Sequence, residues 1–241
     1  MYKIEYLKGS NNGLFLGTDH GLFYREEGMD EWQNVTSNLP NVAVWDIEIN
    51  YSNYSIAVAT FGRGVWEASL PCNGSGNTTY VLQQNETWDD YRSFIGDIII
   101  PEGKTLTITG TVLLGANSRI RVHRGGKLHL DGGLLTDLCD QMWYGVEVWG
   151  SPNYGQNPVD QGWVLIENGG TIENSEQGVV ASLLEEDPSD GELIPNPLYA
   201  GGIIQANDGI FRNNQTAIQL YSYQTTTSGS WFVDCNFYID D

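Results

Sequence analysis

Apolar residues recur at a fixed step in the middle of the chain. Ile98 and Ile120 are 22 positions apart, and the same step separates Leu106 from Leu128 and Leu113 from Leu135. Such a step indicates that successive segments follow the same path and bury their apolar faces on one another. The apolar runs are three to five residues long and lie between glycines, which indicates short strands with tight corners. The pattern predicts an all-β fold, with a right-handed parallel β-helix over residues 93–241 that is truncated at its C-terminus.

A second self-match follows at a longer step. Four pairs are 39 positions apart: Val164 and Ile203, Ile172 and Phe211, Asn174 and Asn213, and Val179 and Ile218. A coil of about 21 residues leaves roughly 18 to spare, which matches the acidic, proline-containing stretch 183–199. We expect this stretch to loop out of the coil, because its prolines lack the amide hydrogens that strand pairing needs. Asn174 and Asn213 should then stack at one corner as a structural ladder.

Residues 1–70 show a different pattern, with short aromatic and aliphatic runs separated by turn sequences such as GSNNG and NYSNY. These runs predict strands at 2–7, 14–18, 22–25, 31–35, 44–50, 55–60 and 64–69. Seven such strands form one four-stranded sheet and most of another. Residues 71–92 are rich in Gly, Asn and Thr, and they predict a linker that leads into a cap on the β-helix.

The motifs GLFLGTDHGLFYR, DEWQNVTSNLP, VWDIEIN and SIAVATFGRGVWEASL resemble the closing blades of a sortilin-type, Asp-box-related β-propeller found in large secreted proteins of Bacteroidetes. The FGRGVW element is the most specific part of the resemblance. The chain departs from a true Asp-box, because the Ser, Asp and Thr of that turn are not in place. The resemblance therefore implies no sialidase activity. Fewer than two blades cannot close a propeller, so we expect the missing blades upstream.

Residues 93–241 carry a second resemblance. The segments GDIIIPEGKTLTITGTVLLG, GGKLHLDGGLLTDLC, MWYGVEVWGS, IENGGTIENSEQGV and GGIIQANDGIFRNN resemble β-helix segments of Bacteroidetes surface proteins exported by the type IX route. The resemblance implies an extracellular or outer cell-surface location, with further domains of the same polypeptide upstream and downstream. It also implies a structural or adhesive role more than any particular reaction.

Charge limits the partners. Eleven basic residues against 31 acidic ones give a net charge of −20. Nucleic acid and anionic membranes both require basic counter-charge, so neither is an expected partner. Membrane insertion is not expected, since no apolar run approaches the roughly 20 residues of a spanning helix. The N-terminus does not resemble a signal peptide. Three cysteines, an odd number without close spacing, leave open one disulfide bridge with a free thiol.

The sequence offers weak candidates for catalysis. Glu147 and Glu167 are about one coil length apart, and two stacked glutamates could serve as acid and nucleophile in a glycoside hydrolase. Arg119, Arg121 and His123 alternate with apolar residues as a basic stripe, suited to uronic acid or sulfate groups but also typical of a plain solvent face. No aspartate cluster recurs with a base at one coil position. We therefore predict no catalytic residue, with a β-helix polysaccharide lyase or glycoside hydrolase as the alternative.

A binding role has better support. Trp149, Tyr154 and Trp163 lie beside or within the loop 150–162, and aromatic rings on a rigid scaffold commonly grip sugars by stacking. We predict that these three rings form a weak site for a polysaccharide or cell-surface glycan; a ligand-free spacer is the other alternative. No cofactor or metal is expected. The acidic insertion has the oxygen donors that calcium prefers, but not the spacing of the EF-hand loop.

Overall fold

The computed structural model describes residues 1–8, 10, 12–36, 39–51, 54–70, 79–138, 140–189, 191–223 and 227–240. The fold is all-β, as predicted, and it contains parallel sheets. The chain divides into two compact units. The first comprises residues 1–78 and 91–95, and the second comprises residues 79–90 and 96–241. No helix in the described part is long and apolar enough to cross a membrane.

The first unit contains all seven strands that the sequence predicts, joined in antiparallel pairs. One sheet has the order β1-β2-β3-β4 and the other the order β5-β6-β7. Alternation explains the packing, because Phe15 on one sheet and Val44 and Ile47 on the other are buried while their neighbours along the strand are more exposed. The strands are β1 (Lys3–Tyr6), β2 (Leu14–Thr18), β3 (Gly21–Arg25), β4 (Gln33–Asn34), β5 (Val44–Asn50), β6 (Ser55–Thr60) and β7 (Gly64–Ser69). A further strand of this unit is β10 (Tyr91–Phe94).

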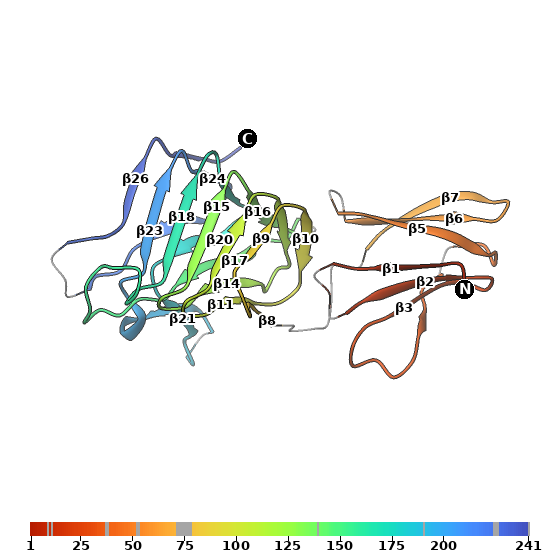
Figure 1. Ribbon diagram of the computed structural model, residues 1–241, viewed down its shortest axis with the longest axis horizontal. Coiled ribbons are helices and arrows are strands. Elements are labelled where there is room, and N and C mark those ends of the chain that lie inside the picture. Colours follow the sequence, from red (N-terminus) through yellow and green to blue (C-terminus); the bar gives the residue numbers. More distant parts are fainter. Residues whose placement is uncertain are drawn as a thin grey trace. The chain divides into compact units, whose positions relative to one another are not determined.

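The second unit is built from three parallel sheets that the chain visits in turn. Sheet I has six strands in the order β8-β11-β14-β17-β20-β25, and sheet II has six in the order β9-β12-β15-β18-β23-β26. The strands of sheet III that belong to this unit run in the order β13-β16-β19-β24-β27. Figure 1 shows the labelled strands β15, β18, β23 and β26 of sheet II side by side. One pass through the three sheets is called a circuit below.

The strands of these sheets are short. Sheet I contains β8 (Tyr80–Val81), β11 (Ile98–Ile100), β14 (Arg119–Val122), β17 (Trp143–Val148), β20 (Ser175–Val180) and β25 (Thr216–Gln219). Sheet II contains β9 (Glu86–Trp88), β12 (Thr105–Ile108), β15 (Lys127–Asp131), β18 (Trp163–Glu167), β23 (Ile203–Asn207) and β26 (Trp231–Val233). Sheet III contains β13 (Thr111–Leu114), β16 (Leu134–Asp137), β19 (Thr171–Glu173), β24 (Ile210–Arg212) and β27 (Asn236–Tyr238).

The interior of the second unit consists of aliphatic side chains stacked from circuit to circuit. Ile98 lies opposite Ile120, and Leu106 lies opposite Leu128, so the 22-residue step is confirmed in sheets I and II. All four side chains are fully buried, and burying each contributes roughly 1.5–3 kcal/mol. The third match, Leu113 with Leu135, is wrong by one residue.

The shift in that third match has a local cause. Val112 lies opposite Leu135, and Leu113 lies opposite Thr136. Ile108 pairs with Leu130 and Thr111 pairs with Leu134, so the chain between the paired positions holds two residues in the first circuit and three in the second. One of these three, Gly132, takes a φ of 68°. A positive φ suits glycine at such a corner. Register in sheet III therefore slips by one position relative to sheet II.

The 39-residue step is confirmed in two of the three apolar matches. Ile172 lies opposite Phe211, and Val179 lies opposite Ile218. Val164 instead lies opposite Ile204, one position beyond the predicted partner.

The insertion 183–199 is an ordered hairpin, which corrects the expectation of an unpaired loop. Strand β21 (Leu183–Glu186) pairs antiparallel with β22 (Leu193–Asn196), and a 3₁₀ turn η1 (Pro197–Tyr199) follows. Pro195 lies opposite Leu184 within the pair, so the prediction that the prolines prevent pairing is wrong. A proline is tolerated on an edge strand where no amide hydrogen is required of it. Asp190 of this segment lies outside the described residues.

The chain first passes from one unit to the other between residues 78 and 79, within the predicted linker and cap, and residues 91–95 belong again to the first unit. Strands β8 and β9 already pair with β11 and β12, so residues 80–88 form the first circuit of the parallel sheets. Residues 71–78 lie outside the described part of the chain, as do Cys72 and Cys139. Cys235 is a free cysteine.

Candidate functional site

Two outer faces of the second unit carry polar and aromatic side chains, and they differ in burial. The covered face is the outer side of sheet I and consists of Arg119, Arg121, His123, Glu147 and Trp149. The open face is the outer side of sheet II and consists of Lys127, His129, Asp131, Trp163, Glu167 and Gln205. Every residue of the open face is partly exposed, whereas the covered face includes an arginine and a glutamate that are buried.

The predicted basic stripe forms the arginine part of the covered face. Ile120 and Val122 point inward and are fully buried, so Arg119 and Arg121 point outward as predicted. They are not free in solvent. Arg119 Nη1 donates to Glu147 Oε1 at 3.0 Å and to the Leu184 carbonyl of the hairpin at 3.4 Å. Arg121 pairs with Asp97 at 2.8 Å, so the stripe serves as an internal ion network.

Glu147 is the acidic centre of this network. It is only 2% exposed. Burial raises the pKa of the Glu147 carboxyl, and the hydrogen bond from Trp149 and the charges of the two arginines oppose that rise. The suggested pair with Glu167 does not form, because Glu147 lies opposite Arg121 in sheet I and Glu167 lies opposite Asp131 in sheet II.

Trp149 is held by the covered face. Its ring stacks on His123 with the ring centres 4.0 Å apart, and Tyr199 of the η1 turn meets it edge-on at 5.2 Å. Its Nε1 donates to Glu147 Oε2 at 3.0 Å. Burial lowers the pKa of His123, as does the charge of Arg121, which favours the neutral imidazole in this stack. The Trp149 ring and its indole N–H therefore both make contacts within the protein.

Tyr154 projects from the loop 150–162. Gln161, which is fully buried, organises this loop: its amide oxygen accepts from the Ser151 backbone at 2.6 Å and its amide nitrogen donates to the Ser151 carbonyl at 3.0 Å. Gln156 connects the loop to the Gly201 carbonyl at 2.8 Å. Tyr154 is 58% exposed, so an ordered loop presents its ring to solvent.

Trp163 begins β18 on the open face. The Lys127 ammonium lies 4.0 Å from the centre of its ring, and its Nε1 donates to Gln205 Oε1 at 3.1 Å. Trp149 directly follows a strand of sheet I and Trp163 begins a strand of sheet II, so the structure does not bring these two rings onto one sheet face. The binding role of the three aromatics stays a prediction, and Trp163 has the setting that suits it best.

Lys127, His129 and Asp131 were not recognised as site residues from the sequence. The alternation in KLHLD places all three outward, while Leu128 and Leu130 are buried. His129 Nε2 lies 2.7 Å from Glu167 Oε1, and His129, Asp131 and Glu167 have potential ligand atoms within 4.8 Å of one another. The alternation was a usable signal, but the approach of Glu167 depends on the length of loop 150–162, which no repeat spacing revealed.

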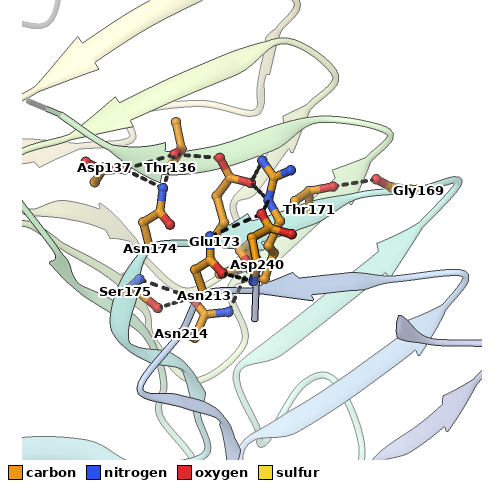
Figure 2. Close-up of polar contacts among 12 residues, drawn as sticks. Thr136, Asp137, Gly169, Thr171, Glu173, Asn174, Ser175, Asn213, Asn214 and Asp240 are labelled. Carbon is orange, nitrogen blue, oxygen red and sulfur yellow. Dashed lines mark hydrogen bonds and ion pairs between the residues drawn. The ribbon is translucent and has the colours of Figure 1, made fainter. Parts of the chain in front are cut away.

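The corner between sheets III and I carries a polar network of another kind (Figure 2). Asn174 and Asn213 take positive φ values of 55° and 54° at equivalent corners. Figure 2 shows Asn174 directed toward Thr136 and Asp137; its amide donates to Asp137 at 2.6 Å. Asn213 Oδ1 accepts from the Asp240 backbone at 2.8 Å. These amides bridge successive circuits.

A buried carboxylate belongs to the same corner. Glu173 accepts from Thr136 Oγ1 at 2.8 Å and from Arg212 Nε at 2.7 Å. The Trp143 indole donates to the Glu173 carbonyl at 2.9 Å. Each partner belongs to the protein, which makes the network structural.

No protein-family model matches the chain, and neither a characterised protein nor a solved structure shows significant similarity to it.

Proposed function

We propose that the second unit is a parallel β-helix of a secreted or cell-surface protein, and that its open face binds glycans through Trp163. The setting of Trp163 carries this proposal. Its ring lies on a partly exposed sheet, with the Lys127 ammonium 4.0 Å from the ring centre and the Gln205 amide at its indole nitrogen. Sugars bind by stacking an apolar face on an aromatic ring while polar groups bond to their hydroxyls, and these residues supply both.

The scaffold supports the β-helix part of the proposal. The chain passes through sheets I, II and III in a recurring order, and buried aliphatic residues stack between circuits. Each circuit therefore contacts the circuits before and after it, as in solenoid proteins. Side chains on such a sheet have fixed spacing, which reduces the entropy lost when a ligand binds.

The site should bind weakly. A single aromatic contact contributes on the order of 1 kcal/mol, and Tyr154 adds a second ring only from the neighbouring loop. Useful avidity would therefore require several copies displayed together, as on a cell surface. The net charge of −20 favours neutral glycans over acidic ones.

The first unit fits a role as the closing blades of a propeller in a larger, type IX-exported polypeptide. Tyr2, Trp45 and Phe61 form a row of stacked rings with centres 5.2 and 5.6 Å apart. All three are exposed. Exposed aromatic patches commonly mark surfaces that bind other protein segments, and further blades of the same polypeptide would cover this one.

A glycan array probed with the whole chain tests the binding proposal. We expect micromolar or weaker binding to neutral polysaccharides that W163A abolishes. Trp66 is a matched control, because it is an exposed tryptophan on β7 of the first unit, and W66A should bind as the wild type does. Absence of any hit would support the ligand-free spacer. Cleavage of a bound polysaccharide would support the lyase or hydrolase alternative.

A further inference from the structure

The open face contains three side chains of the types that hold metal ions. His129 and Asp131 project from β15, and Glu167 projects from β18. Their potential ligand atoms all lie within 4.8 Å of one another. Among the described residues, these three form the one group of His, Cys, Asp or Glu side chains whose potential ligand atoms lie this close together.

The parallel pairing of β15 and β18 creates this arrangement. Residues at alternate positions of a strand share a face, so His129 and Asp131 both point outward. Asp131 lies directly opposite Glu167 on the neighbouring strand, at the usual strand spacing of about 4.8 Å. All three groups thus project from paired strands and none from a loop.

The Asp131 and Glu167 carboxylates repel each other, and other contacts must offset this repulsion. Like charges directly across a strand pair are destabilising. Within the protein, Asn168 Nδ2 donates to Asp131 Oδ1 at 2.6 Å and His129 Nε2 lies 2.7 Å from Glu167 Oε1. The Asn168 hydrogen bond also orients the Asp131 carboxylate, as outer hydrogen bonds do for metal ligands.

The Lys127 ammonium does not offset the repulsion between the Asp131 and Glu167 carboxylates. Lys127 precedes the group on β15. Its ammonium, however, lies over the Trp163 ring, 4.0 Å from the ring centre. A small cation between the carboxylates would offset their repulsion more directly.

We propose that His129, Asp131 and Glu167 bind one divalent transition-metal ion of the zinc class. One imidazole nitrogen and two carboxylate oxygens suit Zn²⁺, whose bonds to these atoms are about 2.0–2.2 Å long. Calcium prefers six to eight oxygen ligands, so the imidazole disfavours it. The ion replaces the contact between His129 and Glu167. Three protein ligands leave a fourth position for water or a ligand hydroxyl.

The site is tested on the whole chain, stripped with EDTA and dialysed, by calorimetric titration with ZnCl₂. We expect one zinc per chain and a rise in Tm on binding. H129Q, D131N and E167Q should each weaken zinc binding at least tenfold, because H129Q removes the imidazole nitrogen and the other two each remove a carboxylate charge. His20 in the first unit, 3.0 Å from Asp19, is the matched control, and H20Q should bind zinc as the wild type does.

Cobalt provides a second readout, the visible absorption spectrum, which reports the types of metal ligand and not the binding constant. Co²⁺ at this site should show visible bands that H129Q alters, without the thiolate charge-transfer band of a cysteine site. Circular dichroism in EDTA verifies that each variant is folded. The proposal is overturned if the wild type takes up no zinc, if H129Q and E167Q bind it unchanged, if cobalt shows thiolate ligation, or if calcium binds more tightly than zinc. None of these outcomes depends on glycan binding.

Discussion

The covered and open faces of the second unit contain similar side chains in different surroundings. Each has basic residues, a glutamate and a tryptophan on adjacent circuits of one parallel sheet. On the covered face, Arg119 and Glu147 bond to each other below 10% exposure. On the open face, Lys127 and Glu167 remain partly exposed. The comparison shows that residue type alone does not distinguish an internal ion network from an accessible site.

The hairpin 183–196 and the turn after it account for much of this difference. The Leu184 carbonyl accepts from Arg119, and Tyr199 packs edge-on against Trp149. Arg124 holds the same region, because its guanidinium donates to the Leu198 carbonyl at 2.7 Å and to the Gly150 carbonyl at 2.6 Å. An insertion between two circuits therefore covers part of sheet I.

The largest expected effect is a difference in stability between the alanine variants of Trp149 and Trp163. W149A should lower the free energy of unfolding by about 3 kcal/mol, because it leaves a cavity beside His123 and Tyr199. W163A should cost only about 1 kcal/mol, chiefly through its cation–π contact. Urea denaturation of the whole chain, followed by hydrogen exchange of the second unit, measures both. Equal losses of unfolding free energy in W149A and W163A would contradict the proposed difference between the covered face and the open face.

The next effect concerns the two basic side chains. R119M should destabilise the chain by about 3 kcal/mol, because removing one partner leaves the buried Glu147 carboxylate poorly compensated. K127M is the matched change on the open face and should cost less than about 1 kcal/mol. Thermal unfolding of both variants at the same pH provides the comparison. A mild R119M effect would mean that Arg121 alone compensates Glu147.

The pH dependence of Glu147 gives a smaller effect with a defined sign. Burial raises the pKa of its carboxyl above the usual 4.5, so the folded chain binds that proton more tightly than the unfolded chain does. Its contribution to stability is therefore fully present below pH 4.5 and is lost as pH rises through the folded-state pKa. The wild type should lose stability relative to E147Q between pH 4.5 and pH 7.5. Urea titrations at both pH values measure this difference, and the opposite trend would show that the arginines outweigh burial.

The smallest effect is expected on the open face without metal. D131N should stabilise the EDTA-treated chain by a few tenths of a kcal/mol, because it relieves the repulsion with Glu167 across the strand pair. The Asp137 carboxylate accepts a hydrogen bond from the Asn174 amide, so D137N should bring no such gain. Melting temperatures in low salt compare the two variants. A loss of stability in D131N would show that its bond with Asn168 matters more than the repulsion.

Local patterns predicted the strands well. The seven strands β1 to β7 were expected within a few residues, because alternation and turn residues act over short distances. The repeat step also identified which residues stack, including Ile98 with Ile120 and Ile172 with Phe211. It failed by one residue for Leu113 and for Val164, where a corner changes length without an apolar marker.

The candidate site was predicted less well, for the same physical reason. Trp163 was recognised by residue type, but its neighbours Lys127 and Gln205 come from other circuits, and their approach depends on the length of the intervening loops. The glutamates were paired by coil length, although the loop 150–162 places Glu167 beside Asp131.

The sequence by itself determined the all-β class, the strands, and the inward-facing residues, because these follow from alternation along the backbone. Only the tertiary structure decided which outward-facing residues are accessible. That depends on what covers each sheet: the hairpin that meets Arg119 lies 65 positions further along the chain. Burial and electrostatics act through space, so the surroundings of Glu147 and of His129 could be known only once the circuits were stacked.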